Sequence, residues 1–471
     1  MVITRYEPTW ESLKRYSVPE WYKDAKFGIF IHWGVYSVPA FGNEWYPRNM
    51  YVKDSPEFKH HKKTWGHQSE FGYKDFIPMF KGEKWDPDAW VALFKQAGAK
   101  YVVPVAEHHD GFSMWASQVN PWNAKSKGPM RDITGEMAEA LRKNNMKLIT
   151  TFHHARNLQR YKNKPNEIDF GKSHYPYISG WPMASEDPEL KILYGNVPEK
   201  EWLENIWFGK LKEVVDQYQP DIIWFDSWLD EIPETYRQKF CAYYLNQAES
   251  WNKEVVIARK QEDLPISFTV DDLEKSRKNK LDTLVWLTDE TVSTGSWCYT
   301  EDLKIKEPKD VLHVLIDIVS KNGVLLLNVS PKADGTIPED QQKVLLTMGD
   351  WLSKYGEAIY ETRPWVVYGE GPTMEPEGNF KNHEEFLKIR YSSRDARYTT
   401  KNEILYAILL GWPVQQEVVL KEGSRLMDRG IRSVKLLGHD AELVWRLSPE
   451  GLGITLPTER VDDMAIVFKI E

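Results

Sequence analysis

The segment Asp221–Trp228, DIIWFDSW, decides the fold because it joins a continuous apolar run to a carboxylate. Such a run is typical of a strand that is buried on both faces, as in a parallel sheet. Asp226 then follows at the carboxyl end of the predicted strand, where a charge flanked by Trp224 and Trp228 is costly unless it is paired or used. Capping of the next helix is the alternative role for Asp226, and this segment alone leaves both roles open.

The same pattern, an apolar run that ends in polar residues, recurs along the first two thirds of the chain. The further runs are Phe27–Ile31, Tyr101–Ala106, Leu148–Phe152, Val255–Ala258, Leu284–Leu287 and Val324–Leu327. Stretches with apolar residues at helical spacing lie between them, namely Pro87–Ala99, Gly135–Asn145, Trp202–Gln219 and Pro233–Trp251. Alternating strands and helices indicate a parallel sheet.

Seven or eight such repeats favour a closed (β/α)8-like TIM barrel, in which catalytic groups follow the carboxyl ends of the strands. The alternative is an open, doubly wound sheet. That architecture is disfavoured because the first run and its continuation, FGIFIHWG, lack the glycine-rich phosphate-binding fingerprint.

The sequence pattern changes near Tyr360. From there, short segments of alternating apolar and polar residues follow one another, separated by turn residues. The predicted strands are Phe386–Tyr391, Glu403–Leu410, Glu417–Leu420, Ser433–Leu437, Glu442–Leu447, Gly453–Leu456 and Met464–Ile470. This spacing is typical of an antiparallel β-sandwich. We therefore expect a catalytic barrel over residues 1–360 and a C-terminal β-sandwich domain over residues 361–471. Supporting the barrel is the simplest role for the second domain; shaping the active-site rim and binding glycan are the alternatives.

Composition excludes several classes of protein. The net charge of −9, from 61 basic and 70 acidic residues, disfavours a nucleic-acid partner. The chain has no run of 18 apolar residues, so we expect no membrane span. Two cysteines, Cys241 and Cys298, are too few for a cysteine-based metal site. The start, MVITRYEPTWESLKRY, lacks a signal-peptide pattern. Location stays open between the cytoplasm and export after removal of a signal, and a homo-oligomer stays open too.

Aromatic residues are abundant, with 21 Trp, 23 Tyr and 18 Phe. Flat rings stack on the C–H faces of sugars, whose hydroxyls need polar partners, although core packing explains any single Trp equally well. The polar residues near the ends of the runs could supply those partners. They include His32, Glu44, His108, His109 and Arg259. Adjacent imidazoles on a strand end point to different sides, so hydroxyl binding fits His108 and His109 better than a shared metal ion does.

Several segments in this order resemble glycoside hydrolase family 29, the α-L-fucosidases. They are WYKDAKFGIFIHWGVYSVPAFGNEWYPRNMY at 21–51, EHHDGFSMWAS at 107–117, DIIWFDSW at 221–228 and GVLLLNVSPKADGTIP at 323–338. The resemblance covers roughly residues 8–365. It implies a catalytic barrel with a C-terminal β-sandwich. It also implies removal of terminal α-L-fucose from a fucosylated glycan or glycoside, with retention of configuration and with no metal or other cofactor.

The resemblance carries roles onto individual residues. Asp226 stands in the position of the family's nucleophile, and Arg259 resembles its active-site arginine. Trp297, in SWCY, resembles the aromatic residue near the methyl group of the sugar. The motifs further imply a set of sugar-binding residues, which are His32, Glu44, Trp45, His108 and His109. His153 stands where a Tyr often lines the pocket, and this departure keeps an α-L-galactosidase on the same scaffold open as an alternative.

The catalytic acid/base departs from the family pattern. Many members carry a Glu directly after the Trp that corresponds to Trp286, whereas this chain has Leu287. Other members take the acid from a loop after the arginine, which here reads SFTVDDLEKSR. That loop offers Asp271, Asp272 and Glu274, of which we favour Asp271 and place Glu274 second, with Asp289 and Glu290 in reserve.

Two other classes of protein compete with this interpretation. A non-catalytic carbohydrate-binding relative would keep the aromatic residues and histidines but would lack a working acid. A metal-dependent barrel hydrolase would need a His-x-His motif at the second apolar run, where this chain has His108 and His109 side by side.

Overall fold

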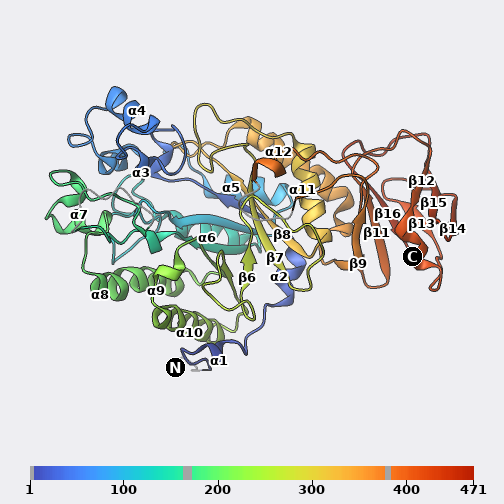
Figure 1. Cartoon of the computed structure of the whole chain (residues 1–471), viewed down its shortest axis with the longest axis horizontal. Coiled ribbons are helices and arrows are strands. Elements are labelled where there is room, and N and C mark those ends of the chain that lie inside the picture. Colours follow the sequence, from blue (N-terminus) through green and yellow to red (C-terminus); the bar gives the residue numbers. More distant parts are fainter. Residues whose placement is uncertain (1–4, 163–171, 377–382) are drawn as a thin grey trace.

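The computed structural model describes residues 5–162, 172–376 and 383–471. Within these ranges, eight parallel strands close into a barrel in chain order, with β8 beside β1 (Figure 1). The strands are β1 Phe27–Ile31, β2 Tyr101–Glu107, β3 Lys147–Phe152, β4 Ile222–Phe225, β5 Val256–Arg259, β6 Val270–Asp272, β7 Trp286–Thr291 and β8 Gly323–Val329. The predicted TIM barrel is therefore confirmed.

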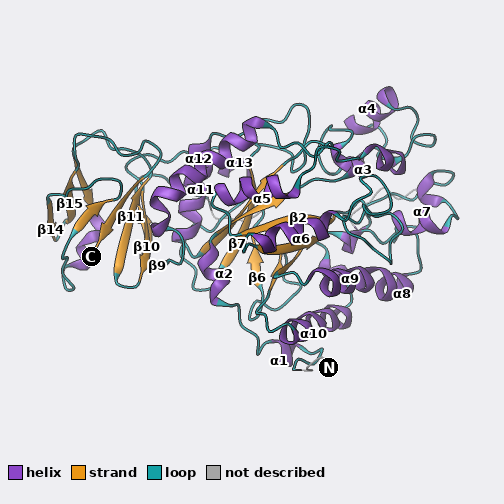
Figure 2. Cartoon of the chain, turned by 180° about the vertical axis from the view of Figure 1, so that it is seen from behind, coloured by secondary structure: helices purple, strands orange, loops and turns teal. Residues whose placement is uncertain are grey.

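Helices cover the outside of the barrel (Figure 2). The helices next to the strands are α5 Pro87–Gln96, α6 Ile133–Lys143, α9 Phe208–Tyr218, α10 Glu234–Ser250, α11 Pro308–Ser320 and α12 Glu339–Tyr355. Shorter ones are α1 Trp10–Leu13, α2 Glu20–Ala25, α3 Tyr46–Asn49, α4 Pro56–Thr64, α7 Pro188–Leu193, α8 Glu199–Glu201 and α13 His383–Phe386. The predicted helix Trp202–Gln219 begins as a π-helical stretch, η6 Trp202–Trp207, and continues as α9.

Alternate residues of the strands fill the barrel interior. Phe30, Val103, Trp224 and Val324 belong to one buried apolar cluster, and the rings of Phe30 and Trp224 meet edge to face at 5.5 Å. A barrel of this size is filled by side chains and leaves no channel. A binding site must therefore lie at the mouth, where the strands end and their polar successors begin.

Strand β6 is the element that the sequence pattern missed. Its three residues, Val270–Asp272, lie in the segment predicted to be a loop. β6 pairs in parallel with β5 and β7, and its shortness and two aspartates remove the apolar run that marks the other strands. β7 also begins two residues later than predicted and includes Thr288–Thr291, so Asp289 and Glu290 belong to a strand.

The C-terminal part forms two antiparallel sheets, of five and three strands over the described ranges. The strands are β9 Arg363–Glu370, β10 Ala396–Lys401, β11 Ile404–Leu409, β12 Glu417–Leu420, β13 Val434–Leu436, β14 Trp445–Ser448, β15 Gly451–Thr455 and β16 Ile466–Ile470. Leu405 and Phe468 of one sheet share a core with Leu420 and Leu452 of the other, which confirms the β-sandwich. The boundary between residues 360 and 361 stays a prediction.

Two details of the second domain differ from the sequence prediction. The expected strand at Phe386–Tyr391 is wrong, because helix α13 ends at Phe386 and turns follow it. β10 was not predicted because two of its four buried residues, Arg397 and Thr399, are polar. These two face the barrel, where the Thr399 hydroxyl donates to the carbonyl of Ala358 at 2.7 Å. Among the described residues, every helix is too short or too polar to cross a bilayer.

A buried charge cluster joins the two domains. Asp317 of α11 accepts contacts from Lys321 at 2.9 Å, Arg277 at 3.2 Å and Arg397 of β10 at 2.7 Å. Glu375 adds a second carboxylate, 3.2 Å from Arg397. Burial alone would raise the pKa of Asp317, but the three cations outweigh it and hold that pKa well below the usual range. The cluster fastens the sandwich to the barrel.

We predict that Asp317→Ala lowers the free energy of unfolding by about 3–5 kcal/mol, because it leaves three buried cations with too little countercharge. Urea denaturation followed by tryptophan fluorescence measures this loss. The wild-type contribution is present above about pH 4 and is lost as the pH falls, since the folded-state pKa lies below the unfolded one. Asp350→Ala is the matched control, because Asp350 pairs with Lys354 on the exposed face of α12, and its urea midpoint should not move. Equal midpoints for both variants would contradict the assigned role.

Candidate active site

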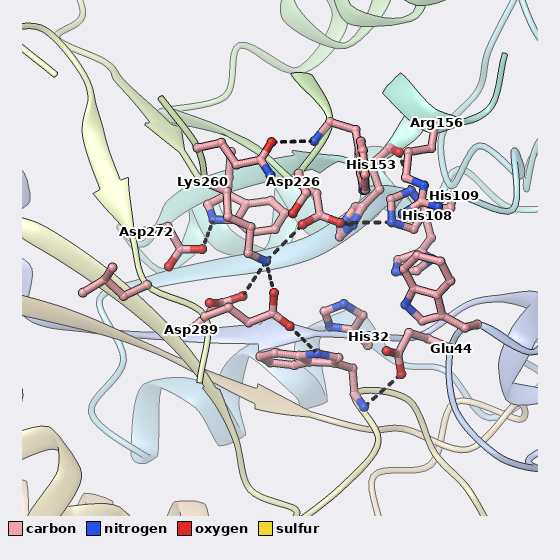
Figure 3. A pocket seen from close by; sticks show the side chains of 18 residues that line it. His32, Glu44, His108, His109, His153, Arg156, Asp226, Lys260, Asp272 and Asp289 are labelled. Atoms are coloured by element: carbon pink, nitrogen blue, oxygen red, sulfur yellow. Dashed lines mark hydrogen bonds and ion pairs between the residues drawn. The ribbon is translucent and has the colours of Figure 1, made fainter. Parts of the chain in front are cut away.

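A cavity of about 510 Å³ opens at the mouth of the barrel (Figure 3). Side chains from the carboxyl ends of several strands converge on it. Its lining is His32, Glu44, Trp45, His108, His109, His153, Arg156, Trp224, Asp226, Ser227, Trp228, Lys260, Gln261, Asp272, Leu273, Glu274, Asp289 and Trp297. Nine of the eleven site residues predicted from the sequence line this cavity, whereas Arg259 and Asp271 do not.

Asp226 follows β4 and is the most heavily contacted carboxylate of the cavity. Its Oδ2 lies 3.0 Å from His109 Nε2 and 3.0 Å from His153 Nδ1, and its Oδ1 lies 3.0 Å from Lys260 Nζ. Burial alone would raise the pKa of Asp226, but the Lys260 ammonium and the two imidazoles outweigh it and hold that pKa well below the usual range. Asp226 is therefore ionised at neutral pH, as a nucleophile must be.

His32, His108 and His109 line the cavity with neutral imidazole rings. His32 Nδ1 lies 2.8 Å from Asn328 Oδ1 at the end of β8, and burial holds the pKa values of His32 and His108 well below the usual range. His109 has Nδ1 2.6 Å from the carbonyl of His153, and burial lowers its pKa to about 4 despite Asp226. A neutral imidazole both donates and accepts, which suits sugar hydroxyls.

His109 faces an acceptor with each ring nitrogen, the carbonyl of His153 with Nδ1 and Asp226 with Nε2. Only an imidazolium could donate to both. Because burial keeps the ring neutral at pH 7, only one of these two contacts is a hydrogen bond at a time.

Lys260 stands at the centre of the acidic groups and was missed in the sequence. Its Nζ lies 2.6 Å from Glu274, 3.0 Å from Asp226 and 3.7 Å from Asp289, as the dashed lines from Lys260 in Figure 3 show in part. The signal for it is strand alternation: Ala258 of β5 points into the barrel, so Arg259 points out and Lys260 in. Burial would lower the pKa of Lys260, but the carboxylates raise it well above the usual value.

The same alternation separates the candidate acids of β6. Val270 points into the barrel, so Asp272 does as well, while Asp271 points outwards. There Asp271 meets Arg259 at 3.3 Å, and neither residue lines the cavity. The preference for Asp271 and the sugar contact expected for Arg259 therefore have no support in the geometry.

The remaining acids divide in the same way. Asp289 lines the cavity, whereas Glu290 turns outwards and pairs with Lys306 at 2.8 Å. Asp272 accepts from Trp224 Nε1 at 3.1 Å. Burial and the neighbouring Asp289 raise the pKa of Asp272 well above the usual range, and burial raises the pKa of Asp289 to about 6. Both carboxyl groups therefore bind a proton more readily than an exposed aspartate does.

Trp45, Trp297 and Glu44 line one side of the cavity. Trp297 stacks on His32 with the ring centroids 5.2 Å apart, and its backbone N–H donates to Glu44 Oε2 at 3.1 Å. Burial raises the pKa of Glu44. Trp45 packs against His109 and beneath Arg156, at 5.2 Å and 4.6 Å respectively. Arg156, Trp224 and Trp228 complete the wall and were not predicted.

Two groups of side chains have the spacing of metal ligands. They are His32, His108 and His153, and His109, His153 and Asp226, with one ligand atom of each within 4.8 Å of the others. Imidazole and carboxylate together suit zinc. The same atoms suit hydroxyl groups equally well, and His153 belongs to both groups, so one ion at most could use it.

A closed parallel barrel whose mouth combines paired carboxylates, imidazoles and tryptophans defines a glycoside hydrolase of the TIM-barrel class. Residues 2–357 match the family model described as Alpha-L-fucosidase, and residues 391–471 match the Alpha-L-fucosidase C-terminal domain. The chain belongs to the α-L-fucosidase family, glycoside hydrolase family 29, and is a glycosidase that acts on α-L-fucosides.

Individual relatives agree over nearly the whole length. Rat tissue alpha-L-fucosidase is 32% identical over 464 residues, which are 96% of this chain and 88% of the relative. The human tissue enzyme is 32% identical over 471 residues, with 96% and 88% covered. The structure of Thermotoga maritima alpha-fucosidase in complex with fucose is 29% identical, with a TM-score of 0.77 and coverage of 99% of this chain and 100% of that one. The non-catalytic alternative is therefore set aside.

We predict that Lys260→Met moves the acid limb of the pH dependence of kcat/KM upwards by about one pH unit or more. Removing the ammonium raises the pKa of Asp226, so this carboxylate becomes protonated at a higher pH. Hydrolysis of an aryl α-L-fucoside, followed between roughly pH 3 and pH 8, measures this limb. Lys306→Met is the control, because Lys306 pairs with Glu290 outside the cavity. An acid limb that is unchanged in Lys260→Met would refute the conclusion that Lys260 lowers the pKa of Asp226.

Proposed function

We propose that this protein is a retaining exo-α-L-fucosidase that works by double displacement, with Asp226 as nucleophile and Glu274 as acid/base. One observation carries the proposal: Lys260 Nζ contacts Asp226 Oδ1 at 3.0 Å and Glu274 Oε2 at 2.6 Å. Because both oxygens contact the same nitrogen atom, the distance between Asp226 Oδ1 and Glu274 Oε2 cannot exceed the sum of these two contact distances. That limit is close to the separation of about 5–5.5 Å in retaining enzymes and short of the roughly 6.5 Å at which inverting pairs begin.

In the first step, Asp226 attacks the anomeric carbon while Glu274 protonates the departing glycosidic oxygen. A glycosyl ester forms on Asp226, and the leaving group departs with the proton. In the second step, Glu274 takes a proton from water as the water oxygen attacks the same carbon and the ester bond breaks. Two inversions give net retention.

The other residues of the cavity bind and orient the sugar. His32, His108, His109 and Glu44 offer donors and acceptors to ring hydroxyls, and Trp297 offers an apolar face to the methyl group. Trp45 and His153 complete the proposed sugar-binding set. The similar Thermotoga maritima alpha-fucosidase is in complex with fucose, which supports recognition of a terminal fucose. We propose that the imidazoles bind hydroxyls directly, with no metal or other cofactor.

Asp272 is the rival for the acid/base role. It lines the same cavity, and burial together with the neighbouring Asp289 raises its pKa well above the usual range, which suits a proton donor. Glu274 is favoured because it reaches the outer edge of the cavity, where the glycosidic oxygen must lie. Its side chain is 16% exposed, whereas Asp272 is only 2% exposed. Buried Asp272 and Asp289 can also supply the proton that Glu274 needs.

An α-L-galactosidase on the same scaffold is the second candidate. Among the described residues, none forms a hydrogen bond with the buried Nε2 of His153, and a further hydroxyl on the sugar could bind there. Relative kcat/KM values for aryl α-L-fucoside and α-L-galactoside distinguish the two functions, since a site that hydrogen-bonds a hydroxyl discriminates strongly against its absence.

We predict that the first sugar released from an aryl α-L-fucoside is the α anomer. Proton NMR during the first minutes, before mutarotation, measures this directly. Running the same assay with excess EDTA serves as the metal control, and the rate should not change. Initial release of the β anomer would overturn the double displacement.

We predict that Asp226→Gly lowers kcat by at least about a thousandfold and that azide restores turnover, giving the β-fucosyl azide. Glu274→Ala should also be rescued, but with the α-fucosyl azide as product, because the ester on Asp226 still forms. Asp271→Ala is the matched control: it removes a neighbouring β6–β7 carboxylate outside the cavity and should keep more than about half of the activity. If azide restored turnover in Asp272→Ala but not in Glu274→Ala, the acid/base would be Asp272.

A further inference from the structure

Three histidines occupy the same position after three neighbouring strands. His32 follows β1, His108 follows β2 and His153 follows β3, each as the first residue beyond its strand. β2 pairs in parallel with both β1 and β3, and neighbouring strands of a sheet lie about 4.7–4.9 Å apart. The three imidazoles therefore meet at the barrel mouth (Figure 3). Their ring centroids are 5.7 Å (His32–His108), 4.4 Å (His108–His153) and 5.9 Å (His32–His153) apart.

The nitrogen atoms of this three-histidine group have few protein partners. Among the described residues, none forms a hydrogen bond with the buried Nδ1 of His108 or the buried Nε2 of His153. His32 Nδ1 lies 2.8 Å from Asn328 Oδ1, which leaves Nε2 of that ring for another contact. One nitrogen atom of each ring lies within 4.8 Å of the other two. Buried polar atoms without partners are unfavourable, so the group is suited to a ligand that all three rings contact.

Neutral imidazole nitrogen atoms are preferred ligands of zinc. Burial keeps the pKa values of His32 and His108 well below the usual range, so both rings have a free lone pair at neutral pH, as metal binding requires. Zn–N bonds of about 2.0–2.1 Å in a tetrahedral site place the ligand atoms about 3.4 Å apart, and small ring rotations reach this spacing. The cavity leaves a fourth position open, as in zinc sites with three protein ligands.

The surroundings of the rings support a metal ion. A histidine that binds zinc through one nitrogen usually donates its other N–H to a carboxylate or carbonyl oxygen, which fixes the ring. His153 Nδ1 lies 3.0 Å from Asp226 Oδ2, and His32 Nδ1 contacts the amide oxygen of Asn328. The cavity lining also holds five carboxyl groups against the two cationic side chains of Lys260 and Arg156. This excess of acidic groups attracts a cation.

The second group with ligand spacing, His109, His153 and Asp226, is a weaker site. His109 Nε2 and His153 Nδ1 are each already 3.0 Å from Asp226 Oδ2. Lys260 Nζ lies 3.0 Å from the other oxygen of Asp226, and its positive charge repels a metal ion at that carboxylate. The three-histidine group is therefore favoured.

We propose that His32, His108 and His153 form a zinc site at the barrel mouth and that zinc bound there excludes the sugar. The site follows from the geometry of the three rings. The exclusion of sugar rests on the function proposed above, because it assigns the same nitrogen atoms to sugar hydroxyls. Zinc is then a competitive inhibitor and takes no part in hydrolysis, which agrees with the metal-free mechanism.

Equilibrium dialysis against zinc chloride tests the site directly. The full chain is first freed of metal with EDTA, which is then removed. We expect one zinc ion per chain at this site and no binding of magnesium at the same concentration, because magnesium prefers oxygen ligands. His32→Asn and His153→Asn each keep an amide near the position of Nδ1 and remove Nε2. Each should weaken zinc binding at least about a hundredfold, more than the loss of an outer hydrogen-bond partner usually costs.

His109→Asn is the matched control, because His109 belongs only to the second group. It should change zinc affinity less than about threefold, and far-UV circular dichroism of all three variants controls for folding. Absence of zinc from the wild type, or wild-type affinity in both His32→Asn and His153→Asn, would overturn the site. Loss of binding in His109→Asn, with binding kept in His32→Asn, would place the ion in the second group and overturn it as well.

Steady-state kinetics test the exclusion of sugar. Zinc at ten times its dissociation constant should raise the apparent KM of the wild type for an aryl α-L-fucoside about elevenfold by mass action and leave kcat unchanged. Free L-fucose should displace zinc in the dialysis. Zinc that binds without raising KM would support the metal site and count against the sugar-binding role of the histidines. Lack of hydrolysis by the zinc-free wild type would count against the proposed function alone, because the dialysis measures the site without it.

Discussion

The ammonium of Lys260, buried among carboxylates at the barrel mouth, is the interaction on which the site depends. A buried cation is costly unless it is paired, and a buried carboxylate equally so. Lys260 contacts Asp226, Glu274 and Asp289, so one positive charge offsets several negative ones. It keeps Asp226 ionised, and it fixes the distance between the two proposed catalytic groups. Burial keeps the imidazoles of His32, His108 and His109 neutral, which suits their proposed role of binding sugar hydroxyls.

Strand alternation then decides which polar residue joins this site and which leaves it. Neighbours such as Arg259 and Lys260 or Asp271 and Asp272 differ by one position in sequence, yet one of each pair faces the cavity and the other faces away. The two residues that face away from the cavity, Arg259 and Asp271, form an ion pair with each other. The alternation of side chains along β5 and β6 thus determines which charged residues line the cavity.

The amino-acid sequence predicted the barrel, the sandwich and the position of Asp226, because buried parallel strands leave long apolar runs and their polar ends meet at one edge. It failed at β6, where three residues with two aspartates give no such run. The prediction of the catalytic acid/base failed for the same reason. In a loop, unlike in a strand, no rule says which side chain points into the barrel, so Asp271 could not be distinguished from Asp272. β10 was missed for a related reason: its polar residues are buried by tertiary contacts to the barrel, which a local pattern does not contain. The family resemblance supplied the roles of individual residues, and Lys260 lay outside the motifs that carried it.

The charge cluster around Asp317 has a consequence for how this protein can change. Asp317, Lys321 and Arg277 belong to the barrel side, and Arg397 and Glu375 to the other. Grafting a foreign sandwich onto this barrel would leave unbalanced charge in a water-free seam unless the graft brought an equivalent arginine and acid. The two modules are therefore expected to be inherited together and to diversify in step, and engineers seeking a minimal barrel would first have to redesign that seam with apolar side chains.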